Sequence, residues 1–185
     1  MEDWIENARM IVDSARAIVP ADGDLSRIRA ARGKGIDRAM MARAGELGLF
    51  LMRVPEEAGG LGLGMRETCE LMQVLGSGLV PEPIGSTIMA GALLGEAFPE
   101  EAASGATVMV TAWQDDAASL RFEGGATGGR LNGAKIAVPG DADVFAVLTG
   151  EGVAIVARDA AGVTVTEADT LYGGRLATLH LDDVA

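Results

Sequence analysis

The apolar positions of the first hundred residues recur every three to four residues, which is the period of an amphipathic α-helix. In the first such segment Asp3 and Glu6 have the spacing of a capping box, and Pro20 marks the end. The polar stretch 21–35 shows no clear pattern. The spacing predicts helices over residues 3–19, 36–47, 65–75 and 86–97, with Ser86 as the N-cap of the last.

The third predicted helix carries Cys69, Met72 and Leu75 on one stripe. This stripe is expected to face the core, because apolar side chains at helical spacing pack inward. Cys69 has no base near it in the sequence, so a buried, inert thiol is expected rather than a nucleophile.

After Gly105 the period of the apolar positions changes to two, which is typical of β-strands. The predicted strands cover residues 107–113, 119–123, 130–138, 144–149, 153–158, 163–167 and 176–181. Gly, Asp and Asn separate them, and no helical pattern intervenes, which favours an antiparallel sheet or small barrel. The predicted fold class is therefore α+β, with an N-terminal all-helical domain over residues 1–105 and an antiparallel β-sheet or barrel domain over residues 106–185.

Charge and composition exclude several kinds of site. The formal net charge of −12 argues against a nucleic-acid surface, because phosphate binding needs clustered Lys and Arg. One Cys and one His exclude an internal disulfide and a zinc site of the usual ligands. The N-terminus is acidic, and no apolar run reaches the roughly 18 residues that cross a bilayer. A soluble, cytoplasmic protein is expected.

The segment RVPEEAGGLGLG, residues 53–64, is rich in glycine but does not match a phosphate-binding loop. Gly60-Leu61-Gly62 begins like a dinucleotide fingerprint, but Met65 occupies the position of the third glycine and no strand precedes the segment. We therefore predict a turn between helices, with the adjacent Glu56 and Glu57 in solvent. His180 alternates with apolar neighbours on a predicted strand, so it is expected on the solvent face.

Several motifs resemble the acyl-CoA dehydrogenase family. Residues 45–51 (GELGLFL) and 54–62 (VPEEAGGLG) are similar to the family pattern "elGl…vPeeyGGlG", and the likeness continues through residues 67–76 and 83–94. In the second half, residues 131–135 (LNGAK) and 179–184 (LHLDDV) are similar to two of the family's strands. The resemblance covers most of the chain and implies the order found here, a helical domain followed by a β domain.

The resemblance implies a function and a set of site residues. The function is FAD-dependent α,β-dehydrogenation of an acyl-CoA thioester, in fatty-acid or lipid metabolism, by a homo- or hetero-oligomer. Cofactor binding would fall on Val110, Thr111 and Trp113, and substrate binding on Ser86, Met89, Ala90 and Leu93. Each reading has an alternative: Thr111 as an ordinary strand residue, Trp113 as a packing residue, and the helix over 86–94 as a closely packed element rather than a groove for an acyl chain.

The sequence also departs from the family pattern. Where the family reads "TEP…GSD", residues 110–116 (VTAWQDD) retain only the threonine. Where the family reads "KtWiTN" beside the flavin ring, residues 135–140 (KIAVPG) have alanine and proline, and proline offers neither a hydroxyl nor a backbone N–H. The chain stops where the family's C-terminal helical bundle, which carries the catalytic glutamate, would begin.

These departures leave more than one function open. The chain is expected to be a segment of a longer subunit or the divergent partner in a heteromeric dehydrogenase, without activity of its own. The alternatives are a non-catalytic module that binds acyl-CoA or another protein, and a structural scaffold without a ligand. No catalytic residue and no metal ligand is predicted.

Overall fold

In the computed structural model the chain forms two compact units, Met1–Val108 and Met109–Ala185. The structure describes residues 3–20, 24–116, 121–125, 128–171 and 174–185. Among these residues, no helix is both long and apolar enough to cross a membrane.

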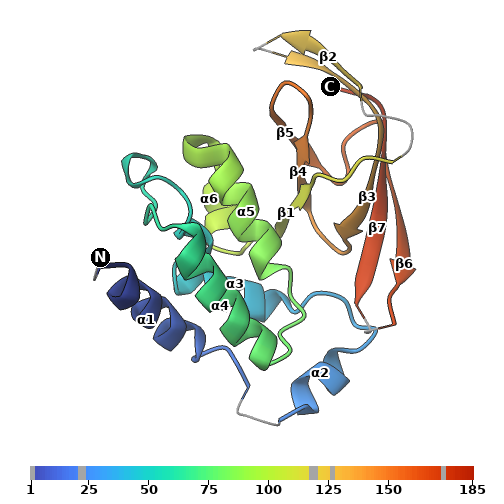
Figure 1. Ribbon diagram of the computed structural model, residues 1–185. Coiled ribbons are helices and arrows are strands. Elements are labelled where there is room, and N and C mark those ends of the chain that lie inside the picture. The colour runs from blue at the N-terminus through green and yellow to red at the C-terminus, as the bar shows by residue number, and fades with distance from the viewer. Residues whose placement is uncertain (1–2, 21–23, 117–120, 126–127, 172–173) are drawn as a thin grey trace. The chain divides into compact units, whose positions relative to one another are not determined.

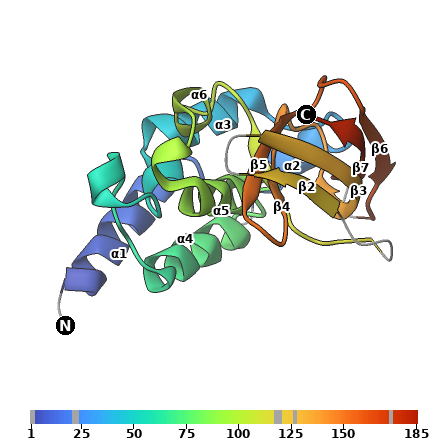
Figure 2. The ribbon, with the colours of Figure 1, turned by 90° about the horizontal axis from the view of Figure 1, so that it is seen from above.

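The first unit is helical (Figure 1). Its α-helices are α1 (Asp3–Ala15), α2 (Ser26–Ala31), α3 (Arg38–Glu46), α4 (Met65–Ser77), α5 (Ile84–Leu94) and α6 (Glu100–Ala103). The described residues also form short 3-10 helices at η1 (Leu49–Leu51), η2 (Glu56–Ala58) and η3 (Gly95–Ala97). α1 and α4 lie side by side in both ribbon views (Figures 1 and 2), and α5 packs on η1 around fully buried Phe50.

Two helix predictions need correction. α2 lies within the stretch 21–35, for which no helix was predicted. None of its residues is buried, so the sequence has no apolar stripe there that would indicate a helix. α5 begins at Ile84 with Pro83 at its N-cap, three residues before the predicted N-cap Ser86. Proline suits a helix entrance because the first amides of a helix have no partner within it, and here Thr87 N donates to Pro83 O. The predicted capping side chain of Asp3 lies outside the described side chains.

Of the stripe predicted on α4, only Leu75 faces the core. Leu71 and Leu75 are buried together with Glu67 and Thr68, whereas Cys69 and Met72 are exposed, so the prediction of a buried thiol was wrong. The two inward polar side chains find partners at the start of the helix. Glu67 Oε2 accepts from Gly64 N at 3.0 Å, and Thr68 Oγ1 donates to Gly64 O at 2.9 Å. Both buried side chains are therefore hydrogen-bonded, as buried polar groups usually are.

The glycine-rich segment is the predicted turn. The amides of Gly60, Leu61, Gly62 and Leu63 donate to the carbonyls of Pro55, Leu51, Val54 and Met52, at 2.7–3.0 Å. These amides are therefore occupied by the chain and do not point toward a phosphate. A Cβ at Gly60 would lie 2.1 Å from Val54 O, so this close return of the backbone requires glycine. Glu56 and Glu57 are exposed, as predicted.

The second unit contains two sheets. β1 (Met109–Ala112), β4 (Val144–Leu148) and β5 (Val153–Ala157) form one, in the order β1-β4-β5. β2 (Arg121–Gly125), β3 (Gly128–Pro139), β7 (Arg175–Val184) and β6 (Val163–Asp169) form the other, in the order β2-β3-β7-β6. Each strand coincides with a predicted segment, although the start of the segment 119–123 lies outside the described residues.

The strand pairs are antiparallel except β1 and β4, which pair in parallel with Thr111 opposite Ala146. A parallel pair needs a long connection, and the β2–β3 hairpin supplies it between β1 and β4. The predicted α+β fold class is confirmed, with this one parallel pair inside the otherwise antiparallel unit. Leu179 and Leu181 face the core, and His180 between them is exposed, as predicted.

Candidate functional site

β1 contains two of the residues predicted to contact a cofactor, and both side chains face inward. Val110 is fully buried and Thr111 is 7% exposed. All four residues of the strand are buried, and β4 pairs along one of its edges. The segment that follows β1, rather than the strand itself, therefore reaches the surface.

Trp113 follows β1 directly and is 63% exposed. The predicted alternative, that it packs into the core, is not what the structure shows. The backbone that follows it is attached to β3, since Ile136 N donates to Gln114 O at 2.9 Å and Asp116 N donates to Ala134 O at 3.2 Å. The Trp113 ring is thus exposed, whereas the backbone next to it is hydrogen-bonded to β3.

Lys135 completes this attachment of the β1 extension to β3. Its side chain is only 2% exposed, and Nζ donates to Asp115 Oδ1 at 2.5 Å and to Trp113 O at 3.5 Å. An ammonium group buried on a strand needs such partners, because removal from water is costly without them. A lysine within an apolar strand was the sequence signal for this contact, but nothing in the sequence named Asp115 as its partner.

β3 changes course immediately after Lys135. The register with β7 shifts between Lys135 and Val138, and Ala137 has a left-handed backbone with φ +54°. Ala137 is exposed, and Pro139 is half-buried. These are the two positions at which the sequence comparison expected a tryptophan and a threonine. The exposed side of this bend therefore presents a methyl group and a proline ring.

In the helical unit, α5 carries the residues predicted to contact an acyl chain. Met89 is half-buried and Leu93 is 41% exposed, one turn apart on the outer face. Gly85 lies on the same face, and a Cβ there would come within 3.0 Å of the Met72 thioether on α4. The predicted residues do not all share this face, because Ala90 is fully buried in the core.

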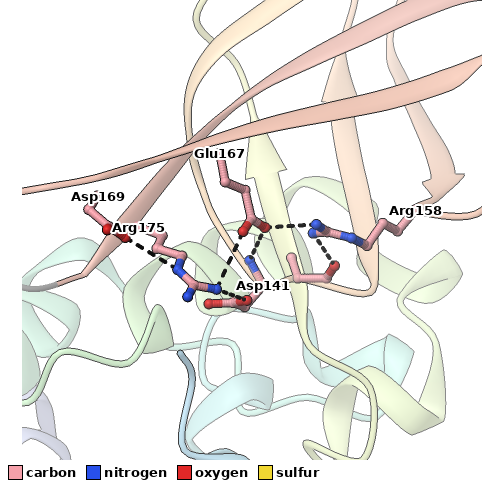
Figure 3. Close-up of polar contacts among 6 residues, drawn as sticks. Asp141, Arg158, Glu167, Asp169 and Arg175 are labelled. Carbon is pink, nitrogen blue, oxygen red and sulfur yellow. Dashed lines mark hydrogen bonds and ion pairs between the residues drawn. The ribbon is translucent and has the colours of Figure 1, made fainter. Parts of the chain in front are cut away.

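A cluster of charged side chains joins the two sheets of the β unit (Figure 3). Glu167 on β6 accepts from Arg158 Nη2 at 2.7 Å and from the Asp141 amide at 3.0 Å. Arg175 on β7 lies 3.1 Å from Asp141 Oδ1, 3.5 Å from Glu167 Oε2 and 3.4 Å from Asp169 Oδ1. The sequence contains these five residues without any spacing that predicts their meeting.

The cluster shifts the pKa values of two of its members. The hydrogen bond from the Asp141 amide is the main cause that lowers the pKa of Glu167, with Arg158 adding to it and desolvation opposing it. The carboxylate of Asp141, followed by that of Glu167, raises the pKa of Arg175. Each charged group in the cluster has a partner of opposite charge. We therefore interpret the cluster as a structural contact between the strands rather than as a catalytic acid–base pair. Among the described residues, no group of His, Cys, Asp and Glu could hold a metal ion.

The sequence model of "Acyl-CoA dehydrogenase, N-terminal domain" matches residues 5–103. The chain belongs to the acyl-CoA dehydrogenase family. The predicted recognition is thereby confirmed on the helical half, where the match ends close to α6. No curated protein matches the sequence at a significant level.

Solved structures extend the likeness to the whole chain. The ChsE4-ChsE5 complex from Mycobacterium tuberculosis matches all of this chain at 24% identity, with a TM-score of 0.75. The G363A variant of the Tcur3481-Tcur3483 steroid acyl-CoA dehydrogenase matches 99% at 22% identity, also with a TM-score of 0.75. The electron transferring flavoprotein of Acidaminococcus fermentans matches all of the chain at 19% identity, with a TM-score of 0.68. At these identities the likeness shows a shared fold.

The chain spans about half the length of these solved structures, 55% of the first two and 56% of the third. It corresponds to a helical domain and a β domain of the family.

The residues at β1 and β3 do not fit the flavin contacts implied by the family pattern. The Thr111 side chain faces inward, Trp113 stands where the pattern has proline, and the bend of β3 offers Ala137 and Pro139. Proline has no N–H and alanine has no polar side-chain atom, so neither can donate a hydrogen bond through its side chain to a ring edge. The donor set of the family pattern is missing from this surface.

Proposed function

We propose that this chain is the divergent partner in a heteromeric acyl-CoA dehydrogenase. In this assembly it shapes the binding site for the acyl-CoA thioester, and a second kind of chain supplies the flavin contacts. The observation that carries the proposal is the replacement of the expected flavin contacts on β3 by Ala137 and Pro139, in a chain that otherwise keeps the family fold.

The names of two similar structures support a heteromeric assembly. ChsE4-ChsE5 is a two-protein complex, and Tcur3481-Tcur3483 is a steroid acyl-CoA dehydrogenase named from two proteins. We carry only the two-chain arrangement over to this protein.

The part of the substrate that this chain would contact is the acyl chain. The outer face of α5 presents Met89 and Leu93, and Met72 of α4 lies against the same face at Gly85. Methionine side chains are unbranched and adapt to ligands of different shapes. Burial of apolar surface against an acyl chain contributes about 25 cal/mol per Å² before the costs of binding. Ser86 lies on the same helix, and its hydroxyl is polar enough to orient the thioester end of a substrate.

The proposal predicts acyl-CoA binding without turnover by the purified chain. We expect octanoyl-CoA to raise the melting temperature, since a ligand selective for the folded state stabilises it, and we expect no reduction of ferrocenium in the presence of FAD and octanoyl-CoA. Leu93→Ser should abolish the stabilisation, whereas Met65→Ser, which changes an exposed apolar residue at the start of α4, should leave it intact.

Two results would count against the proposal. Turnover of octanoyl-CoA by the chain alone would show that it supplies its own flavin contacts and base. Equal stabilisation of both variants would show that α5 is not the acyl-contacting element.

A further inference from the structure

α2 is a helix whose stability depends on contacts outside itself. It has six residues, none of them buried. Helices this short do not persist in isolation, because one or two hydrogen bonds cannot compensate for the cost of forming the first turn. The helical state of residues 26–31 therefore requires support from the rest of the helical unit.

Arg27 provides such support by linking α2 to two other helices. Its Nη2 atom lies 2.5 Å from Glu82 Oε1 and 3.4 Å from Asp37 Oδ2. Asp37 is the N-cap of α3, where its Oδ1 accepts from Met40 N at 3.1 Å. Glu82 immediately precedes Pro83, the N-cap of α5. One guanidinium thus joins α2 to the N-terminal ends of α3 and α5.

Glu82 is buried in an environment that does not fully satisfy it. Its side chain is 2% exposed, and its second oxygen, Oε2, is buried without a hydrogen-bond partner among the described residues. A buried carboxylate oxygen without a partner is destabilising, because the carboxylate has lost water on that side. Arg27 therefore contacts Oε1 of a carboxylate whose other oxygen has no such partner.

We propose that α2 is a strap that fastens to the N-terminal end of α5 through Arg27 and can release without unfolding the helical unit. On release, Oε1 of Glu82 can bind water in place of Arg27, which offsets part of the lost ion pair. The strap fastens next to the N-terminus of α5, the helix whose outer face carries Met89 and Leu93. This inference stands on contacts within the helical unit and is independent of any cofactor or partner chain.

The strap can be tested by limited proteolysis of the full chain with thermolysin, which cleaves before Ile28, Ala30 and Ala31 in α2. We expect Arg27→Gln to raise the initial rate of cleavage within α2 at least fivefold. Arg29→Gln removes the same charge from an exposed position of the same helix and should leave the rate within twofold of the unsubstituted chain. Glu82→Gln should also raise the rate, because a neutral amide holds a guanidinium less strongly than a carboxylate does.

Salt and melting temperature distinguish a releasing strap from a general loss of structure. Cleavage within α2 of the unsubstituted chain should accelerate between low and high NaCl concentration, since Arg27 and Asp37 are partly exposed and salt screens their attraction. The melting temperature of Arg27→Gln should stay close to that of Arg29→Gln. Equal cleavage rates in the two variants would overturn the proposal. So would accelerated cleavage at Leu71 and Leu75 of α4 along with α2, because Arg27 would then be supporting the whole unit.

Discussion

Lys135 shows how a single residue sets what the surface near β1 can do. Its buried ammonium group attaches the β1 extension to β3 through Asp115, whose own side chain is 52% exposed. A pair with one buried and one hydrated member avoids the full penalty of a buried ion pair. The same attachment keeps Trp113 in place with its ring in solvent, next to a β3 bend that has no side-chain donor.

Glu167 is the residue at which pH should affect the stability of the β unit. Its pKa is lowered in the folded state, so the stabilisation is present above the pKa of the unfolded chain and is lost as the pH falls through the folded value. We expect Glu167→Gln to lower stability near neutral pH by roughly 0.5–1 kcal/mol, the range of partly exposed ion pairs. The difference from the unsubstituted chain should shrink as the pH falls from neutral to below the ordinary glutamate pKa of about 4.3.

The measurement is thermal unfolding across this pH range, followed by circular dichroism. Glu151→Gln is the matched control, because this substitution removes the same charge from an exposed position on the β4–β5 turn. A difference between Glu167→Gln and the unsubstituted chain that stays constant with pH would contradict the assigned role of the carboxylate.

At the scale of elements, α4 has apolar residues on two faces and only one of them packs inside the unit. Leu71 is fully buried, whereas Met72, its neighbour in sequence, is 43% exposed. We expect Leu71→Ala to destabilise the helical unit by about 2–5 kcal/mol through the lost contacts and the cavity. Met72→Ala should change the stability by no more than about 0.5 kcal/mol.

Urea unfolding of the two variants, with helical ellipticity as the signal, measures both changes. If the sequence-predicted stripe were the packed one, the order would reverse, and Met72→Ala would be the more damaging substitution. The comparison is internal to one helix, so differences in helix propensity between the two sites are small.

The same helix illustrates where sequence reasoning stops. Periodicity located the helix over 65–75 within two residues of its observed end, but it chose Cys69 and Met72 for the core. Periodicity could not predict that Glu67 and Thr68 form hydrogen bonds with Gly64 at the helix start. These bonds allow the two polar side chains to be buried without losing all their hydrogen-bond partners. The strands were predicted well because the alternation of apolar and polar residues is a local pattern. The parallel pairing of β1 with β4 could not be predicted in this way, because it joins residues more than thirty positions apart.

The candidate site shows the same division. Residues 54–62 identified the family and the turn, because a close backbone return requires glycine at a fixed position. Sequence also named Met89 and Leu93, which the structure places on one face of α5. It did not reveal that Ala90 faces the core, or that Lys135 reaches Asp115, since both facts depend on packing between distant segments.

At the scale of the whole molecule, the chain contains two compact units that together span about half the length of the family structures it resembles. The helical unit keeps the sequence pattern of the family through residue 103, whereas the β unit keeps the fold and loses the expected flavin contacts. This division within one chain is the basis for assigning it the substrate-shaping part of a shared site.

The most direct test is the visible absorption spectrum of the purified chain after incubation with FAD and gel filtration. Our account predicts a colourless protein, because Ala137 and Pro139 present no side-chain donor to the flavin ring and Thr111 faces the core. A retained flavin band with close to one FAD per chain would contradict it, and would show that this chain holds the cofactor by itself.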